Sequence, residues 1–271
     1  MDISTAIGLI LGIGLVSQGI IFGHGQLQWF LNPPAIGIVL GGTLAATLVN
    51  YPIQNFMQLF KVTKVIFGAQ KSGYIEMINL LVDKAEKARK TGIMSLEADL
   101  ASINDKFLRN GIELAINEQD ANRLRNFLSL ELSNIRHRHA IAQEIFFYMG
   151  AYAPAFGMLG TVMGLIVMMN NFSGGGGDGA IGKVNFDVAA KFAELLAGMG
   201  LALITTFYGV LLSNLVFLPI GGKLKRKSEE EIMVKNIMAE GIIGIHAKDH
   251  PILLREKLMT FVPQSKRTKK E

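Results

Sequence analysis

Few residues in this sequence combine a type and a spacing that could do chemistry. The chain has no cysteine, and its five histidines form no metal-binding pattern. His137 and His139, for example, are two positions apart and would point to different faces of a helix. No nucleophile motif occurs, and the glycine run at 173–179 lacks the following lysine of a phosphate-binding loop. We therefore predict that the chain is not an enzyme and has neither a metal site nor a cofactor.

The polar groups that stand out are threonine hydroxyls within long apolar runs, among them Thr161, Thr205 and Thr206. These hydroxyls could line an ion path, or they could bond to carbonyl groups one turn earlier in their own helices. An ion carrier also needs a group that binds and releases charge at membrane depth, usually a carboxylate. Because the apolar runs contain no acid, ion transport by this chain would require a second polypeptide that contributes one.

The elements that would position these threonines are membrane-spanning helices. Half of the 271 residues are hydrophobic, and four runs contain no charged residue: 3–22, 34–51, 145–172 and 195–222. Twenty helical residues extend about 30 Å, which is the thickness of the hydrocarbon layer. The sequence therefore predicts four spans, arranged as two pairs.

The distribution of basic residues predicts the topology. All Lys and Arg residues except Lys183 and Lys191 lie at 50–144 or after residue 222. Cytoplasmic segments next to membrane spans carry an excess of Lys and Arg. We therefore expect both termini and the long middle segment to be cytoplasmic. A cleaved signal peptide is the alternative for 3–22, but no basic residue precedes this run and no A-x-A site follows it.

The expected fold is an all-α membrane protein with four transmembrane helices. A transmembrane hairpin at 1–51 is followed by a cytoplasmic helical domain at 52–144 that lies between spans two and three. A second transmembrane hairpin at 145–222 would line any ion path. The helix of span four is expected to continue into the cytoplasm, where 223–271 forms C-terminal helices and a basic tail.

Local patterns predict where individual helices begin and end. Pro33 and Pro34 suit the first turn of span two. Apolar residues at helical spacing predict a helix through 96–108, and Gly92 and Gly111 are expected to interrupt the helices of the middle segment. An amphipathic stretch at 120–139 is expected to run directly into span three.

Small and charged residues near the spans suggest two further features. Glycines four residues apart allow helix backbones to approach closely in lipid, and such pairs occur at Gly8 and Gly12, Gly37 and Gly41, and Gly160 and Gly164. Glu194 lies at the mouth of span four, three residues after Lys191, so the two can pair on one helix face. We regard this pair as a candidate ion entrance.

Four motif-rich stretches carry a resemblance to a known family. They read ARKTGIMSLE at 88–97, YAPAFGMLGTVMGL at 152–165, LITTFYG at 203–209, and EGIIGI at 240–245. Together with the paired arrangement of the spans, these stretches resemble the MotA/PomA-type A subunits of the bacterial flagellar stator. The resemblance extends from span one to Pro263.

This resemblance implies a motor protein of the bacterial inner membrane. The A subunits would form a ring, expected to be a pentamer, around a dimer of B subunits. Each B subunit would contribute one transmembrane helix with an ion-carrying aspartate, and a peptidoglycan-binding domain. Flow of Na⁺ or H⁺ would drive rotation, so the partners would be the B subunit, the rotor switch protein, further copies of the chain and membrane lipid, with no nucleic acid.

The resemblance also implies which charges face the rotor. The family's rotor-facing residues correspond to Arg89 and Glu97, with Lys90 as an accessory candidate, and charges at such a mobile interface suit steering and repeated release. A solvated helix face or an internal ion pair is the alternative. The sequence departs from polar-type members of the family, which carry further acids after the position of Glu97: here Ala98 is neutral, Asp99 is acidic and Leu100 is apolar. The number of acids at the rotor contact therefore stays open.

Roles in ion transport and coupling follow from the same resemblance. Pro154 and Pro219 match family prolines near the membrane ends of spans three and four and would couple ion binding to movement, although a static kink or a helix end is the alternative. Sodium-type relatives carry threonine at the positions of Thr161, Thr205 and Thr206. Because Na⁺ needs more oxygen ligands than one carboxylate supplies, whereas H⁺ does not, we favour sodium over proton.

Two other functions are considered beside the stator. An ExbB/TolQ-like proton-channel subunit would energise envelope processes from a related ring, but such subunits usually have three spans. A non-conducting membrane scaffold would organise partners through its arginine-rich helices.

Overall fold

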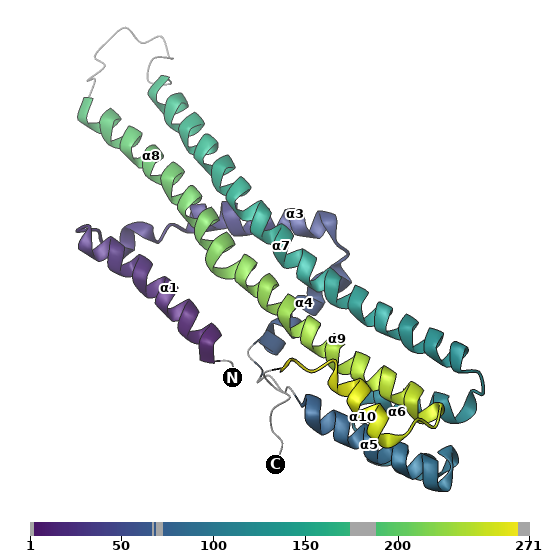
Figure 1. The fold of residues 1–271 in the computed structure, drawn as a ribbon. Coiled ribbons are helices and arrows are strands. Elements are labelled where there is room, and N and C mark those ends of the chain that lie inside the picture. The colour runs from purple at the N-terminus through teal and green to yellow at the C-terminus, as the bar shows by residue number, and fades with distance from the viewer. Residues whose placement is uncertain (1–2, 67, 69–72, 174–187, 265–271) are drawn as a thin grey trace. The chain divides into compact units, whose positions relative to one another are not determined.

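The computed structural model describes residues 3–66, 68, 73–173 and 188–264, and every secondary-structure element within these ranges is helical (Figure 1). The chain divides into two units. The first comprises Met1–Ala69 and Ile141–Leu224, and the second comprises Gln70–Ala140 and Lys225–Glu271.

Four helical stretches are long and apolar enough to cross a membrane: Ser4–Phe22, Leu27–Asn50, Ala121–Asn170 and Leu195–His246. Each overlaps one of the charge-free runs, so the predicted all-α fold with four apolar spans is confirmed. The last two stretches are much longer than a bilayer requires, since about 20 residues suffice to cross.

The first unit contains the hairpin of spans one and two together with most of spans three and four. Its elements are α1 (Ile3–Phe22), η1 (Leu27–Phe30), α2 (Pro33–Ile36), η2 (Gly37–Gly41), α3 (Gly42–Asn50), α4 (Ile53–Ile66), α7 (Ala121–Ser173) from residue 141, α8 (Val188–Leu211), η5 (Leu212–Phe217) and α9 (Leu218–His246) to residue 224. The turns η2 and η5 are π-helical, and each is continuous with an α-helix on both sides.

The start of span two has the predicted chemistry. Asn32 precedes the helix in an extended conformation, and its Oδ1 accepts a hydrogen bond from the backbone N–H of Ala35 at 3.1 Å. Pro33 occupies the first helical position, where its missing N–H would have had no partner in the helix. The side chain of Asn32 and the ring of Pro33 therefore fix where this helix begins.

The first unit buries few side chains. Its core includes Val39, Ile145, Phe146 and Met149, while none of the residues in the first span is buried. Lipid tails solvate apolar side chains as well as a protein core does, so such exposure costs little in a membrane. Leu59 of α4 belongs to this core, so α4 is part of the first unit, although the predicted boundary at residue 52 placed it in the middle domain.

The second unit is packed like a soluble helical domain. Its elements are α5 (Tyr74–Thr91), η3 (Ile93–Ser102), α6 (Lys106–Asn117), α10 (Pro251–Met259), and the parts of α7 and α9 outside the first unit. Large aliphatic side chains fill the core and are completely or almost completely buried: Ile78, Leu81, Leu96, Ile112, Leu128 and Ile242.

The structure confirms one prediction for this region and corrects two. Residues 121–139 of the predicted amphipathic stretch are part of α7, a single helix that includes span three. The segment 96–108 is not one helix, because η3 is a 3-10 helix and α6 begins after Asp105, whose carboxylate accepts a hydrogen bond from Leu108 N–H at 3.1 Å. Gly111 lies within α6 and allows the close approach of Ile242 instead of ending the helix.

Candidate functional site

The three predicted ion-path threonines meet where α7 packs against α8. Thr161 Oγ1 lies 2.5 Å from Thr206 Oγ1 and 3.1 Å from the carbonyl oxygens of both Gly157 and Ala202. Thr205 is fully buried, and its hydroxyl donates to Ala202 O at 2.8 Å. Hydroxyl and carbonyl oxygens from two helices therefore gather in one place inside an otherwise apolar region.

Glycines allow the two helices to come this close. A Cβ atom at Gly157 would lie 2.9 Å from Thr205 O, and one at Gly209 would lie 2.6 Å from Ala153 O. Gly164 likewise faces the backbone of Ala202, at 3.2 Å. Contacts to backbone atoms cannot be relieved by a change of rotamer, so the register of α7 against α8 depends on these glycines.

The predicted glycine pairs have different environments. Gly160 and Gly164 both pack against α8, which confirms tight packing for that pair, and Gly12 packs against Leu215. In contrast, no atom lies within 4 Å of a Cβ built at Gly8, and Gly37 and Gly41 are equally open. Within the described part of the chain, the tight packing predicted for these three glycines is not formed.

Pro154 lies within α7, and its missing N–H is compensated from the neighbouring helix. Proline cannot donate to the carbonyl four residues earlier, which here is Gly150 O. The buried hydroxyl of Ser213, in η5, donates to this oxygen at 2.6 Å. Pro219 is the second residue of α9, next to the end of η5, where the N–H of Leu218 bonds to Ser213 O, five residues earlier. One serine thus connects the helical irregularities beside both predicted coupling prolines.

Tyr208 is a second polar anchor in the first unit. Its hydroxyl donates to Phe30 O and accepts a hydrogen bond from Asn32 N–H at 3.3 Å, so α8 holds the connection between spans one and two. Phe30 and Phe207 add an edge-to-face contact, with ring centroids 5.2 Å apart. Sequence reasoning singled out neither Ser213 nor Tyr208 for these contacts, because both depend on which helices become neighbours.

The predicted rotor-facing residues flank one turn in the second unit. Arg89 and Lys90 lie in the last turn of α5, and Glu97 lies on η3. The turn passes through Gly92, whose φ of +88° lies in the region that favours glycine. All three charged side chains are exposed.

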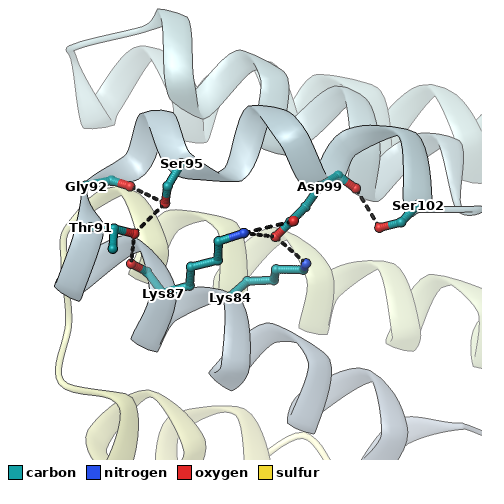
Figure 2. Close-up of polar contacts among 7 residues, drawn as sticks. All are labelled: Lys84, Lys87, Thr91, Gly92, Ser95, Asp99 and Ser102. Atoms are coloured by element: carbon teal, nitrogen blue, oxygen red, sulfur yellow. Dashed lines mark hydrogen bonds and ion pairs between the residues drawn. The ribbon is translucent and has the colours of Figure 1, made fainter.

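Hydroxyl groups brace this turn (Figure 2). Thr91 Oγ1 lies 2.8 Å from both Lys87 O and Ser95 Oγ, and Ser95 Oγ donates to Gly92 O at 2.7 Å. The end of α5 and the beginning of η3 are therefore joined by a short chain of hydrogen bonds.

Most other charges beside the turn are bound to one another. Lys90 Nζ lies 2.5 Å from Glu86 Oε1, and Lys84 Nζ lies 2.6 Å from Asp99 Oδ2. Within the described ranges, neither Arg89 nor Glu97 forms an ion pair. The alternative of an internal ion pair is therefore not formed at either residue, and both charges are open to a partner.

The two residues of the candidate ion entrance have no described side-chain geometry. Lys191 and Glu194 lie in α8, but their side chains are outside the described part of the structure.

Two of the histidines form hydrogen bonds within the chain. His139 Nδ1 lies 2.9 Å from Ser228 Oγ, and His246 Nε2 lies 2.8 Å from Glu118 O. No group of three potential metal ligands occurs among the described residues.

Two family models cover most of the chain. The MotA/TolQ/ExbB proton channel family matches residues 99–236, and the N-terminal region of motility protein A matches residues 6–92. The first match includes the threonine cluster and both prolines, and the second includes the hairpin of spans one and two.

Similarity also extends over whole proteins. The motility protein A of Borreliella burgdorferi is 31% identical, with 99% of this chain and 96% of the relative aligned. The chemotaxis protein PomA of Vibrio alginolyticus is 30% identical over 98% of each chain. The flagellar MotAB stator complex from Bacillus subtilis contains a chain that is 28% identical, covers 99% of both chains and superposes with a TM-score of 0.83.

These proteins are channel and motility proteins, and the matches confirm that the chain is not an enzyme. Four apolar spans and full-length similarity also identify it as a multi-pass membrane protein. The chain therefore belongs to the MotA/TolQ/ExbB proton channel family, and within it to the motility protein A or PomA type.

Proposed function

We propose that this chain is the A subunit of a bacterial flagellar stator, which converts transmembrane ion flow into torque on the rotor. The observation that carries the proposal is the full-length match to a chain of the Bacillus subtilis MotAB stator complex, at 28% identity and a TM-score of 0.83. The match of residues 6–92 to the N-terminal region of motility protein A favours a stator over an ExbB/TolQ-like channel subunit.

The composition of the spans supports a role for a B subunit. The four charge-free runs contain no carboxylate, so the chain alone has no group that takes up and releases an ion at membrane depth. We propose that a ring of five copies surrounds two B subunits, each of which contributes a transmembrane aspartate. The purified chain alone, reconstituted in vesicles, should not conduct Na⁺ or H⁺, whereas selective conduction by the chain alone would contradict this proposal.

The threonine cluster supports sodium as the coupling ion. Thr161 Oγ1 and Thr206 Oγ1 lie together with two backbone carbonyl oxygens, and hard cations such as Na⁺ prefer oxygen ligands. An interhelical hydrogen bond in a membrane contributes only about 0.6 kcal/mol on average. These hydroxyls can therefore turn toward an ion at little cost while the glycine contacts keep the helices together.

Substitution of Thr206 tests the sodium proposal. Thr206→Ala should lower swimming speed in sodium medium at fixed pH and leave the amount of protein in the membrane unchanged. The matched control is Thr47→Ala, because Thr47 is a buried threonine of another span whose hydroxyl bonds to Thr43 O of its own helix, at 2.7 Å. A speed that does not depend on sodium concentration in the unsubstituted protein would contradict sodium coupling.

We propose that Arg89 and Glu97, with Lys90 as an accessory, contact opposite charges on the rotor switch protein. Both main residues are exposed, and within the described ranges neither forms an ion pair. Glu97→Lys should reduce torque while the protein remains in the membrane. Full motility of this variant would remove Glu97 from the rotor contact, and full motility of Arg89→Ala would favour a scaffold.

The same function requires the second unit and both termini to be cytoplasmic. Because the chain has no cysteine, single cysteines can report topology without interference. Trp29→Cys and Met94→Cys introduce thiols at side chains that are 60% and 63% exposed. A membrane-impermeant thiol reagent should label the first in intact cells and the second only after permeabilisation, and the reverse pattern would invert the proposed topology.

A further inference from the structure

Asp99 is the acidic residue that follows Glu97 in η3, and its carboxylate is held by two lysines of α5 (Figure 2). Lys84 Nζ donates to Asp99 Oδ2 at 2.6 Å, and Lys87 Nζ lies 2.9 Å from both carboxylate oxygens. The side chains of Asp99 and Lys84 are only 22% and 18% exposed. Asp99 thus turns toward α5, and its charge is neutralised by cations of the same chain.

The geometry of η3 relates this contact to Glu97. Side chains three residues apart are eclipsed in a 3-10 helix, so Leu96 and Asp99 lie on the same face. Leu96 is fully buried in the core of the second unit, and Asp99 binds α5 beside it. Glu97 is one residue after Leu96, which turns its side chain about 120° away, toward solvent.

The helix η3 needs stabilising contacts with neighbouring elements. A 3-10 helix has poorer hydrogen-bond geometry than an α-helix, and runs beyond three or four residues are uncommon. The ten residues of η3 therefore depend on contacts with their neighbours. Leu96 supplies an apolar anchor before Glu97, and Asp99 supplies a charged anchor after it.

We propose that Asp99 is a positioning residue: its clasp on Lys84 and Lys87 holds η3 on α5 and so sets the place of Glu97 relative to Arg89. Asp99 itself is then not a rotor contact. The proposal concerns the rotor-facing surface of the proposed stator function and rests on that function for its effect on torque, but the clasp can be measured without a rotor.

The first experiment removes the charge of Asp99 and keeps its shape. In Asp99→Asn, amide hydrogen exchange at 93–102 should become severalfold faster in the purified full chain, and torque on tethered beads should fall. Asp99→Glu should restore part of both signals. The matched control is Asp83→Asn, which makes the same change of charge at an exposed position of α5 and should alter neither signal. Unchanged exchange and torque in Asp99→Asn would overturn the proposal.

The second experiment exchanges the charges of the clasp. Asp99→Lys alone and the pair Lys84→Glu with Lys87→Glu should both lose exchange protection and torque. The triple variant restores opposite charges with the sign reversed. Because a clasp requires only complementary charges, protection and torque should both recover. A rotor contact depends on the sign of the charge at residue 99, so recovered protection without recovered torque would overturn the positioning role.

The two measurements separate this proposal from the rotor-contact proposal. If Glu97→Lys and Arg89→Glu leave torque unchanged while Asp99→Asn accelerates exchange at 93–102, the rotor contact has failed and the clasp stands. If Glu97→Lys reduces torque and Asp99→Asn changes neither exchange nor torque, the clasp has failed and the rotor contact stands.

Discussion

In the first unit, α7 and α8 meet through glycine and threonine, whereas the helices of the second unit meet through leucine and isoleucine. At Gly157 and Gly209, backbone faces backbone. In the second unit, Leu81 and Ile242 are completely buried among other aliphatic side chains.

The difference reflects the two solvents. Apolar side chains gain no hydrophobic free energy when they move from lipid into a helix interface. Helices in a membrane therefore associate through close backbone contact and hydrogen bonds between helices. In water, removing apolar surface from the solvent is itself the driving force, and large side chains supply the most surface. One chain therefore follows two packing rules, and substitutions of the same kind should have different costs in its two units.

The largest effect is expected from a cavity in the aliphatic core. Leu81→Ala should lower the free energy of unfolding of the second unit by about 2–5 kcal/mol, because a buried leucine leaves both a transfer cost and a void. Amide hydrogen exchange in α5 would measure this change. Leu80→Ala is the control on the next residue, which is 38% exposed, and a similar loss there would show that the core does not dominate this unit.

A smaller but clear effect is expected when a methyl group is inserted between α7 and α8. Gly209→Ala should destabilise the helix pair by about 1–3 kcal/mol, because the new Cβ would lie 2.6 Å from Ala153 O. Thermal unfolding in detergent would measure the loss. Gly200→Ala, in the same helix, meets no atom within 4 Å and should be tolerated. Equal stability of the two variants would contradict the close backbone contact.

Loss of an ion-pair network in the second unit should cost less. Glu240 lies 3.0 Å from Arg125 Nη1 and 2.7 Å from Lys257 Nζ. Glu240→Gln keeps the volume and removes the charge, so we expect a loss of roughly 1 kcal/mol, limited by the exposure of both cations. Amide exchange in α10 should measure this loss of stability. Unchanged exchange there would mean that the network does not stabilise the second unit.

The same carboxylate predicts a dependence on pH. Burial acts to raise the pKa of Glu240, but the hydrogen bond and charge of Lys257, together with Arg125, hold it below its usual value. Because the pKa of Glu240 is lower in the folded state than in the unfolded state, its ionised carboxylate stabilises the folded protein at pH values above the unfolded-state pKa of about 4.3. This contribution should be constant from pH 8 to pH 5 and should disappear as the pH falls through the lowered value. Glu240→Gln should remove that part of the acid sensitivity.

The smallest effect is expected from a glycine of the second unit. A Cβ at Gly111 would lie 2.5 Å from Cδ1 of Ile242, which is the end of a flexible side chain. Gly111→Ala also favours the helical conformation by up to about 1 kcal/mol. The net change should therefore stay within about 1 kcal/mol, as measured by amide exchange in α6. A loss as large as that of Gly209→Ala would remove the contrast between the two units.

Features with a local cause were predictable from the sequence. The four spans follow from runs without charge, and the start of span two at Pro33 and the end of α5 at Gly92 follow from the backbone chemistry of proline and glycine. The break between η3 and α6 was missed, although the capping residue Asp105 was a signal for it. An apolar repeat was interpreted as one helix because its spacing alone does not distinguish an α-helix from a 3-10 helix followed by a cap.

Features decided by tertiary packing could not be predicted in the same way. That Thr161 meets Thr206 depends on the register of α7 against α8, which no short-range rule sets. The unpaired carbonyl of Gly150 could be inferred from Pro154, but its donor could not. The residues of the candidate rotor contact were selected by resemblance, whereas the role of Asp99 beside them emerged only from its two lysine partners.

The π-helical turn at Leu212–Phe217 also changes how residues are assigned to helix faces along the continuous helix formed by α8, η5 and α9. Each α-helical residue advances about 100° around the axis, and a π-helical turn absorbs one additional residue. A helical wheel drawn continuously through α8 and α9 therefore misassigns every later face by about 100°. This turn is the position at which evolution could delete one residue without rotating the side chains that follow, whereas the same deletion within α8 would rotate all of them.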